Sequence, residues 1–167
     1  MEDEDLERWA DDGGNFGPLT PVRGPEPDDE VLLYRIEDAK GYGPFQGSPA
    51  WGYGPDQIDW DRYNEDTDNF PSPRNDPGFD QPTLWRMMGD GHIWETGCCS
   101  VDQLRHWFDE RTAAILARYG YFYTIWRARA EKAVEGAFQA VFDRRCADCL
   151  ERLPADRLYA PELPLAA

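Results

Sequence analysis

Acidic and aromatic side chains alternate between residues 56 and 70 of this 167-residue chain, and their chemistry is that of a docking surface. Carboxylates steer a basic partner, and large rings anchor it after contact. A cation site is disfavoured, because the spacing lacks the central Gly and closing Glu of a calcium-binding loop. The alternative is an acidic surface that serves only solubility. The residues predicted to bind a basic protein partner are Asp56, Asp59, Trp60, Asp61, Tyr63, Glu65, Asp66 and Asp68, with Trp9 as a further anchor.

Four polar side chains form a second candidate site. Arg35 lies on an expected strand, Ser100 opens an expected helix, and Glu135 and Gln139 lie just before and on a late strand. This arrangement is similar to that of ADP-ribosyltransferases, in which an Arg and a Ser position NAD and an acid stabilises the charge developing on the ribose. The resemblance implies NAD as cofactor and these four residues as catalytic, with Glu135 supplying the charge that Gln139 lacks. In the structural alternative, Arg35 pairs with a loop carboxylate, Ser100 caps a helix and Gln139 lies at the surface.

The cysteines and histidines offer weaker signals. The chain has Cys98-Cys99 and a Cys146-x-x-Cys149 pair, and a helix there would place the paired thiols on one face. A zinc ribbon needs a second such pair, which is absent, and no export signal is visible. We therefore expect buried free thiols and no metal site, with a redox pair as the alternative. The two histidines, His92 and His106, are expected to be structural.

Charge is distributed unevenly along the chain. The net charge is −16, and residues 1–80 hold 15 of the excess negative charges. Such a field repels phosphate backbones, so direct binding to nucleic acid is disfavoured. No apolar run approaches the length of a membrane span, and the acidic start differs from a signal peptide. We expect a protein of the host cytoplasm that does not contact the membrane.

The pattern of elements predicts an α+β fold. Apolar and β-branched residues predict strands over 31–37, 121–127 and 137–142. The apolar spacing over 133–142 also fits a helix, so both alternatives stay open there. A capping pair, Ser100 and Gln103, opens one main helix over about 100–119, on which a small sheet should pack. A second helix is expected over about 143–152.

Stretches rich in Gly and Pro mark the expected domain limits. Residues 1–29 read as an extended acidic arm, 30–153 as a single α+β domain and 154–167 as a proline-rich tail. Inside the domain, residues 41–82 form a long loop rich in Gly, Pro and Asp. A loop of this length within a domain is typical of a functional segment.

Several short motifs, in order, resemble a family of small uncharacterised phage and prophage proteins. The matching stretches are Tyr34-Arg35-Ile36-Glu37, Gly43-Pro44-Phe45, Pro71-Ser72-Pro73 with Asp76, Gly97-x-x-Ser100-x-x-Gln103-Leu104-x-x-Trp107-Phe108, the aromatic strand after Gly120, and Gln139-x-x-Phe142. The resemblance covers roughly residues 31–145. It implies a phage-type accessory protein with an α+β fold and brings no known reaction.

Three functional hypotheses follow. The first is an accessory protein that binds a basic partner through its acidic first half, as a nucleic-acid mimic that inhibits a host defence nuclease, of the anti-CRISPR or anti-restriction type. The second is an enzyme or degenerate relative of ADP-ribosyltransferase type. The third is a structural or assembly protein of a phage particle.

Overall fold

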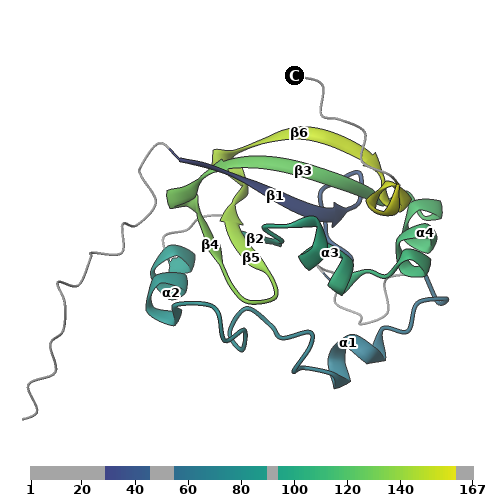
Figure 1. Cartoon of the computed structure of the whole chain (residues 1–167), viewed down its shortest axis with the longest axis horizontal. Helices are drawn as coiled ribbons and strands as arrows, with labels where there is room; N and C mark the ends of the chain where they lie inside the picture. The colour runs from purple at the N-terminus through teal and green to yellow at the C-terminus, as the bar shows by residue number, and fades with distance from the viewer. Residues whose placement is uncertain (1–28, 46–54, 90–93, 161–167) are drawn as a thin grey trace, which may run out of the picture.

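The strand expected at 31–37 is present as β1 (Glu30–Glu37) in the computed structural model, which describes residues 29–45, 55–89 and 94–160 (Figure 1). It pairs antiparallel with β3 (Phe122–Arg129), the aromatic strand expected near 121–127. β3 pairs in turn with β6 (Ala147–Pro154), which gives a sheet of order β1-β3-β6. Successive side chains of β3 point to opposite faces, as the period of a strand requires, and both faces are buried: Tyr123 and Ile125 enter one hydrophobic cluster, and Trp126 and Ala128 enter another.

A second antiparallel sheet stands beside the first, where the sequence predicted only one. It has the order β2-β5-β4, from β2 (Trp94–Gly97), β5 (Ala140–Asp143) and β4 (Ala133–Glu135). Two backbone hydrogen bonds between Tyr34 and Cys98, of 2.8 and 2.9 Å, connect β1 to the end of β2. This bridge brings the polar residues of β1 next to those of β2.

The main helix expected over 100–119 is two helices, α3 (Val101–Trp107) and α4 (Glu110–Arg118). The Ser100 hydroxyl accepts from the Gln103 N–H at 3.1 Å, so the predicted start is confirmed. The helix breaks because Asp109 caps α4, accepting from the Thr112 N–H at 2.8 Å. The apolar spacing continues across this break, which is why the sequence pattern resembled one longer helix.

The prediction of a helix over residues 143–152 is wrong. Residues Arg144–Cys146 form a single 3-10 turn, and the chain then continues as β6. Pairing with β3, from Ala128 opposite Ala147 to Phe122 opposite Pro154, outweighs the local helical pattern. Cys146 and Cys149 therefore do not share a helix face.

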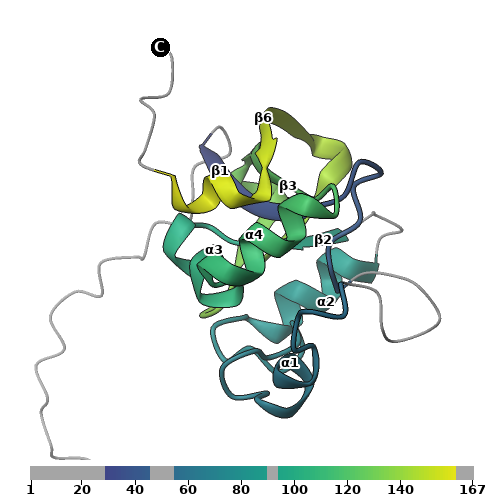
Figure 2. The ribbon, with the colours of Figure 1, turned by 90° about the vertical axis from the view of Figure 1, so that its right-hand side faces the viewer.

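The long segment between β1 and β2 contains two short helices, α1 (Asp61–Glu65) and α2 (Gln81–Gly89). Between these helices the chain has no regular structure, but buried side chains attach it to the body, namely Phe70, Asp76 and Phe79. Figures 1 and 2 place α1 at the opposite end of the molecule from β6. The described part of the expected loop, residues 41–45 and 55–82, thus packs on the body of the protein.

The expected arm lies, apart from Asp29, outside the described residues, and so does Trp9. At the other end, Ala155–Tyr159 form a 3-10 helix after β6, and Ala155 and Leu158 are buried. The folded part therefore continues past residue 153. Within the described ranges, none of the helices is both long enough and apolar enough to cross a bilayer.

Candidate functional site

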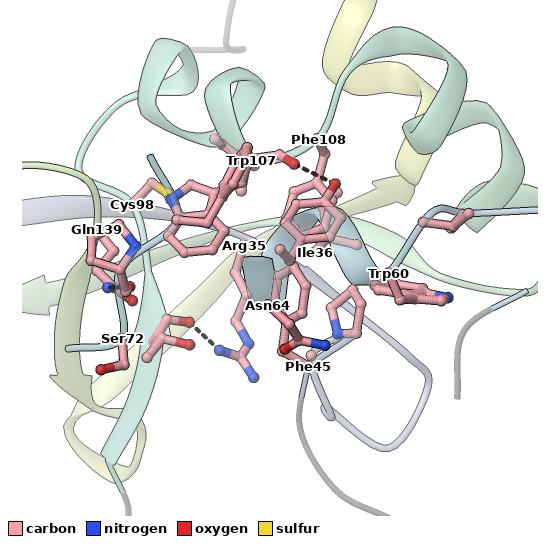
Figure 3. Close-up of a pocket in the computed structure, with 18 of the residues that line it drawn as sticks. Arg35, Ile36, Phe45, Trp60, Asn64, Ser72, Cys98, Trp107, Phe108 and Gln139 are labelled. Carbon is pink, nitrogen blue, oxygen red and sulfur yellow. Dashed lines mark hydrogen bonds between the residues drawn. The ribbon is translucent and has the colours of Figure 1, made fainter. Parts of the chain in front are cut away.

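A cavity of about 1030 Å³ lies between residues 43–45 and 56–73 on one side and the junction of β1, β2 and α3 on the other. Its volume suits a small ligand or part of a bound peptide. Figure 3 shows Gln139 and Ser72 on one side, Phe45 and Trp60 on the other, and Arg35 between them. The two sides differ in chemistry, one being polar and the other aromatic and acidic.

The aromatic side is a continuous cluster of rings. Phe45 is the most exposed ring of this cluster, with 48% of the residue accessible to solvent. Its ring centroid lies 4.9 Å from that of Tyr63. The Tyr63 hydroxyl donates to the Trp107 carbonyl at 2.7 Å, and burial raises the pKa of Tyr63 to about 12, so this phenol stays neutral. The rings that line the cavity are Phe45, Trp60, Tyr63, Phe70, Trp107 and Phe108.

Exposed carboxylates surround this aromatic side. Asp56, Asp59 and Asp61 line the cavity itself and flank Trp60. Three more follow along the chain at Glu65, Asp66 and Asp68, and all six are exposed. We call these six residues the acidic rim. Among the described residues, none of the six forms a salt bridge, because Arg62, the nearest cation in sequence, pairs with Asp109 at 3.2 Å.

Two buried polar side chains hold the 70–76 segment against the second sheet. Asp76 accepts hydrogen bonds from three backbone N–H groups, those of Gly78 at 2.9 Å, Ala137 at 2.7 Å and Phe138 at 3.0 Å. Gln139 donates from Nε2 to the Pro71 carbonyl at 2.6 Å. These bonds place one wall of the cavity.

Arg35 lies at the centre of a buried ion network. Its guanidinium donates to Glu37 at 3.1 Å and Glu95 at 2.7 Å, and also to the Thr96 carbonyl. The Glu37 carboxylate, which is fully buried, also forms salt bridges with Arg144 and Arg152. Burial lowers the pKa of Arg35, and the two glutamates oppose that shift. Arg35 therefore reaches the cavity with its charge largely compensated.

The structure brings together two of the four residues named for the NAD site. Arg35 and Gln139 both line the cavity, and both are buried rather than exposed. Ser100 is not among the lining residues, and its hydroxyl serves as the cap of α3. Glu135 is exposed on β4, likewise outside the lining. The carboxylate needed beside the ribose is thus not at the cavity wall.

The residues named for partner binding divide into two groups. All of the carboxylates are exposed, whereas Tyr63 is only 7% exposed and Trp60 is half-buried. These rings belong to the cavity wall rather than standing out from the surface as anchors.

The four cysteines differ in burial, and Cys146 and Cys149 are exposed rather than buried as expected. Burial raises the pKa of Cys98, and raises that of Cys99 to about 12, while Cys146 and Cys149 are exposed. All four cysteines are free. In the part of the chain that the structure describes, no three His, Cys, Asp or Glu side chains are grouped so as to hold a metal ion.

Sequence reasoning missed Asp76 as the residue that places the cavity wall, and it missed Phe45 and Trp107 as part of the ring cluster. An acid beside prolines and glycines, in the run from Pro71 to Phe79, is a signal for a buried turn carboxylate. The ring cluster gave no such signal, because its members come from segments far apart in sequence.

Comparison with known proteins places the chain in a phage family. No curated protein and no solved structure matches it. The sequence model of the family described as bacteriophage T4 Y00F protein matches residues 31–156, which is more than half of the chain and includes every residue that lines the cavity. The chain therefore belongs to the bacteriophage T4 Y00F protein family.

Proposed function

We propose that this phage protein binds a basic protein partner through the acidic rim. The observation that carries the proposal is the rim itself, six exposed carboxylates without salt bridges among the described residues, on one stretch beside an open cavity. Opposite charge accelerates encounter with a basic surface and disfavours acidic partners. Residues 1–30, which hold 11 acids and two arginines, extend the negative charge in sequence.

The partner we propose is a nucleic-acid-binding protein. Such proteins present arginine and lysine grooves that neutralise phosphates, and closely spaced carboxylates can occupy these grooves in place of a phosphate backbone. In a phage family, the consequence that fits is inhibition of a host defence nuclease. The support is the density and exposure of the carboxylates together with family membership.

Salt and competition test this function. A tagged full-length chain is used to capture proteins from host lysate, at about 0.05 M and about 0.5 M salt, where the Debye lengths differ roughly threefold. We expect a basic, nucleic-acid-binding protein to be retained at low salt, released at high salt, and displaced by duplex DNA. Capture that is insensitive to both salt and DNA would contradict the proposal.

A second candidate function is binding of an NAD-type nucleotide in the cavity. It is favoured by one observation, that Arg35 and Gln139 line a cavity of about 1030 Å³ together with stacking rings. The three rim carboxylates in the lining oppose it, since they repel a pyrophosphate. Titration with NAD, followed by tryptophan fluorescence, tests it, with Gln139→Ala as the variant expected to weaken binding.

A further inference from the structure

We propose that the cavity beside the acidic rim receives an arginine or lysine side chain of the protein partner. This inference rests on the proposed function and deepens it, since it assigns the contact that turns electrostatic attraction into specific docking. The ligand class is a cationic side chain on an extended peptide segment. A single side chain does not fill about 1030 Å³, so flanking peptide would occupy the remainder.

The aromatic side provides the surface that a cation needs. Phe45 is half exposed although its centroid lies within 5.7 Å of those of Trp60, Tyr63, Trp107 and Phe108. A guanidinium or ammonium group is attracted to ring faces, and the attraction grows as water is excluded. A cation therefore binds more strongly to exposed rings in a cavity wall than to the same rings on an open surface.

The same ring cluster already holds one guanidinium on another side. The Cζ atom of Arg62 lies 5.2 Å from the ring centroid of Tyr63 and 5.0 Å from that of Phe70. Arg62 does not line the cavity, and its charge is directed to Asp109. Tyr63 and Phe70 thus accept a cation within the protein itself, and both also line the cavity.

Charge in the lining selects the sign of the ligand. Asp56, Asp59 and Asp61 contribute three carboxylates, and Arg35 contributes one guanidinium. Two buried glutamates, Glu37 and Glu95, already pair with that guanidinium. The local field is therefore negative, which favours a cationic side chain over a phosphate-bearing ligand.

The polar side suits the peptide backbone that carries this side chain. Gln139 donates through Nε2 to the Pro71 carbonyl, which orients its amide. Within the described chain, its Oε1 has no hydrogen-bond donor, so it can accept from a backbone N–H of the ligand. The cavity thus offers an acceptor for the peptide, ring faces for the cation and carboxylates around its charge.

A matched set of peptides tests the inference on the full-length chain. The probes are a pentapeptide with a central arginine between glycines, and the same peptide with citrulline, which keeps the shape and removes the charge. Binding is followed by NMR through the indole N–H signals of Trp60 and Trp107, assigned with Trp→Phe variants. We expect the arginine peptide to shift both signals, with binding about tenfold weaker for citrulline.

Variants and a nucleotide complete the test. Asp59→Asn with Asp61→Asn should weaken arginine-peptide binding about tenfold, whereas the control pair Glu131→Gln with Asp156→Asn, exposed elsewhere, should not change it. Equal binding of citrulline and arginine peptides, or no shift with either, would overturn the inference. Shifts caused by NAD but not by the arginine peptide would overturn it in favour of the nucleotide site.

Failure of this inference is distinguishable from failure of the proposed function. Phe45→Leu with Trp60→Leu removes two rings and keeps every carboxylate of the rim. If the cavity receives a side chain, this variant captures the partner at least tenfold less tightly while circular dichroism shows it folded. Unchanged, salt-sensitive capture by the folded variant would overturn the cavity contact and leave rim binding intact.

Discussion

Asp76 accepts a hydrogen bond of 2.7 Å from the backbone N–H of Ala137, 61 positions further along the chain. This contact ties the segment that carries the acidic rim to the turn between β4 and β5. The fit is close, because a Cβ atom at Gly136 would lie 2.6 Å from the Asp76 carboxylate. The wall of the cavity therefore depends on one buried carboxylate and on a glycine opposite it.

Replacing Asp76 with alanine should destabilise the protein. The variant removes the buried acceptor of three part-buried hydrogen bonds, from the N–H groups of Gly78, Ala137 and Phe138, and one hydrogen bond to a charged group contributes about 1.5–3 kcal/mol. We expect a loss of at least about 2 kcal/mol in the free energy of unfolding, measured with urea. Asp68→Ala, at an exposed site in the same segment, is the control and should change stability by less than about 0.5 kcal/mol. Equal stability of the two variants would contradict the role of Asp76.

Glu37, at the centre of the arginine network, should contribute more to the free energy of unfolding than Glu30, which belongs to a surface ion pair. Glu37→Gln removes the charge shared by Arg35, Arg144 and Arg152, and breaking a buried pair typically costs about 3–5 kcal/mol. Glu30→Gln serves as its control, because Glu30 is exposed and lies 3.7 Å from Arg127. An exposed pair contributes about 0–1 kcal/mol. Urea titration of both variants compares the losses, and similar values would refute the network.

Stability should depend on acid pH through the cap of α4. Partial burial raises the pKa of Asp109, but hydrogen bonds from Thr112 and Arg62 outweigh it, so the pKa is lowered in the folded protein. A lowered pKa gives stability that is present above the unfolded value and lost as the pH falls through the folded value. Asp109→Asn keeps a capping oxygen without the charge. The variant should be less stable than the native protein at pH 7, and the difference should shrink below about pH 3.8.

The measurement for this cap is urea unfolding of both proteins at pH 7 and pH 3. Asp109→Ala provides the second comparison, because it removes the cap at every pH and should cost about 1 kcal/mol. A difference between native protein and Asp109→Asn that stays constant from pH 7 to pH 3 would rule out the charge as its source.

Thiol labelling should follow burial. Cys98 is 3% exposed and burial raises its pKa, so its thiolate is scarce and shielded. Cys146 and Cys149 are exposed and should react first with iodoacetamide at pH 8. Peptide mass spectrometry of the folded and urea-unfolded protein measures the order, and early labelling of Cys98 in the folded protein would contradict this core.

Local patterns predicted the elements that local residues determine. The strand of residues 31–37 and the helix start at Ser100 are of this kind. The predicted helix over 143–152 is absent because its residues pair with β3 instead, and the contact between the two sheets depends on the Tyr34–Cys98 bridge. Neither relationship is visible in a window of ten residues.

The candidate site divides in the same way. The carboxylates of residues 56–68 could be predicted, because exposure of acids follows from their own chemistry. The role of Tyr63 could not, since a ring beside acids suits a surface anchor as well as a cavity wall until Trp107 and Phe45 are placed beside it. Side chains from distant segments decide between the two.

One comparison tests the central claim most directly, namely partner capture by the native chain and by two matched variants at low salt. The first variant neutralises the rim through Asp59→Asn, Asp61→Asn and Glu65→Gln. The second makes the same change in charge elsewhere, through Glu131→Gln, Asp148→Asn and Asp156→Asn, all exposed. We predict that the rim variant loses at least about 90% of the captured basic protein, while the control variant retains it. Equal retention by both variants, or equal loss, would contradict binding through the acidic rim.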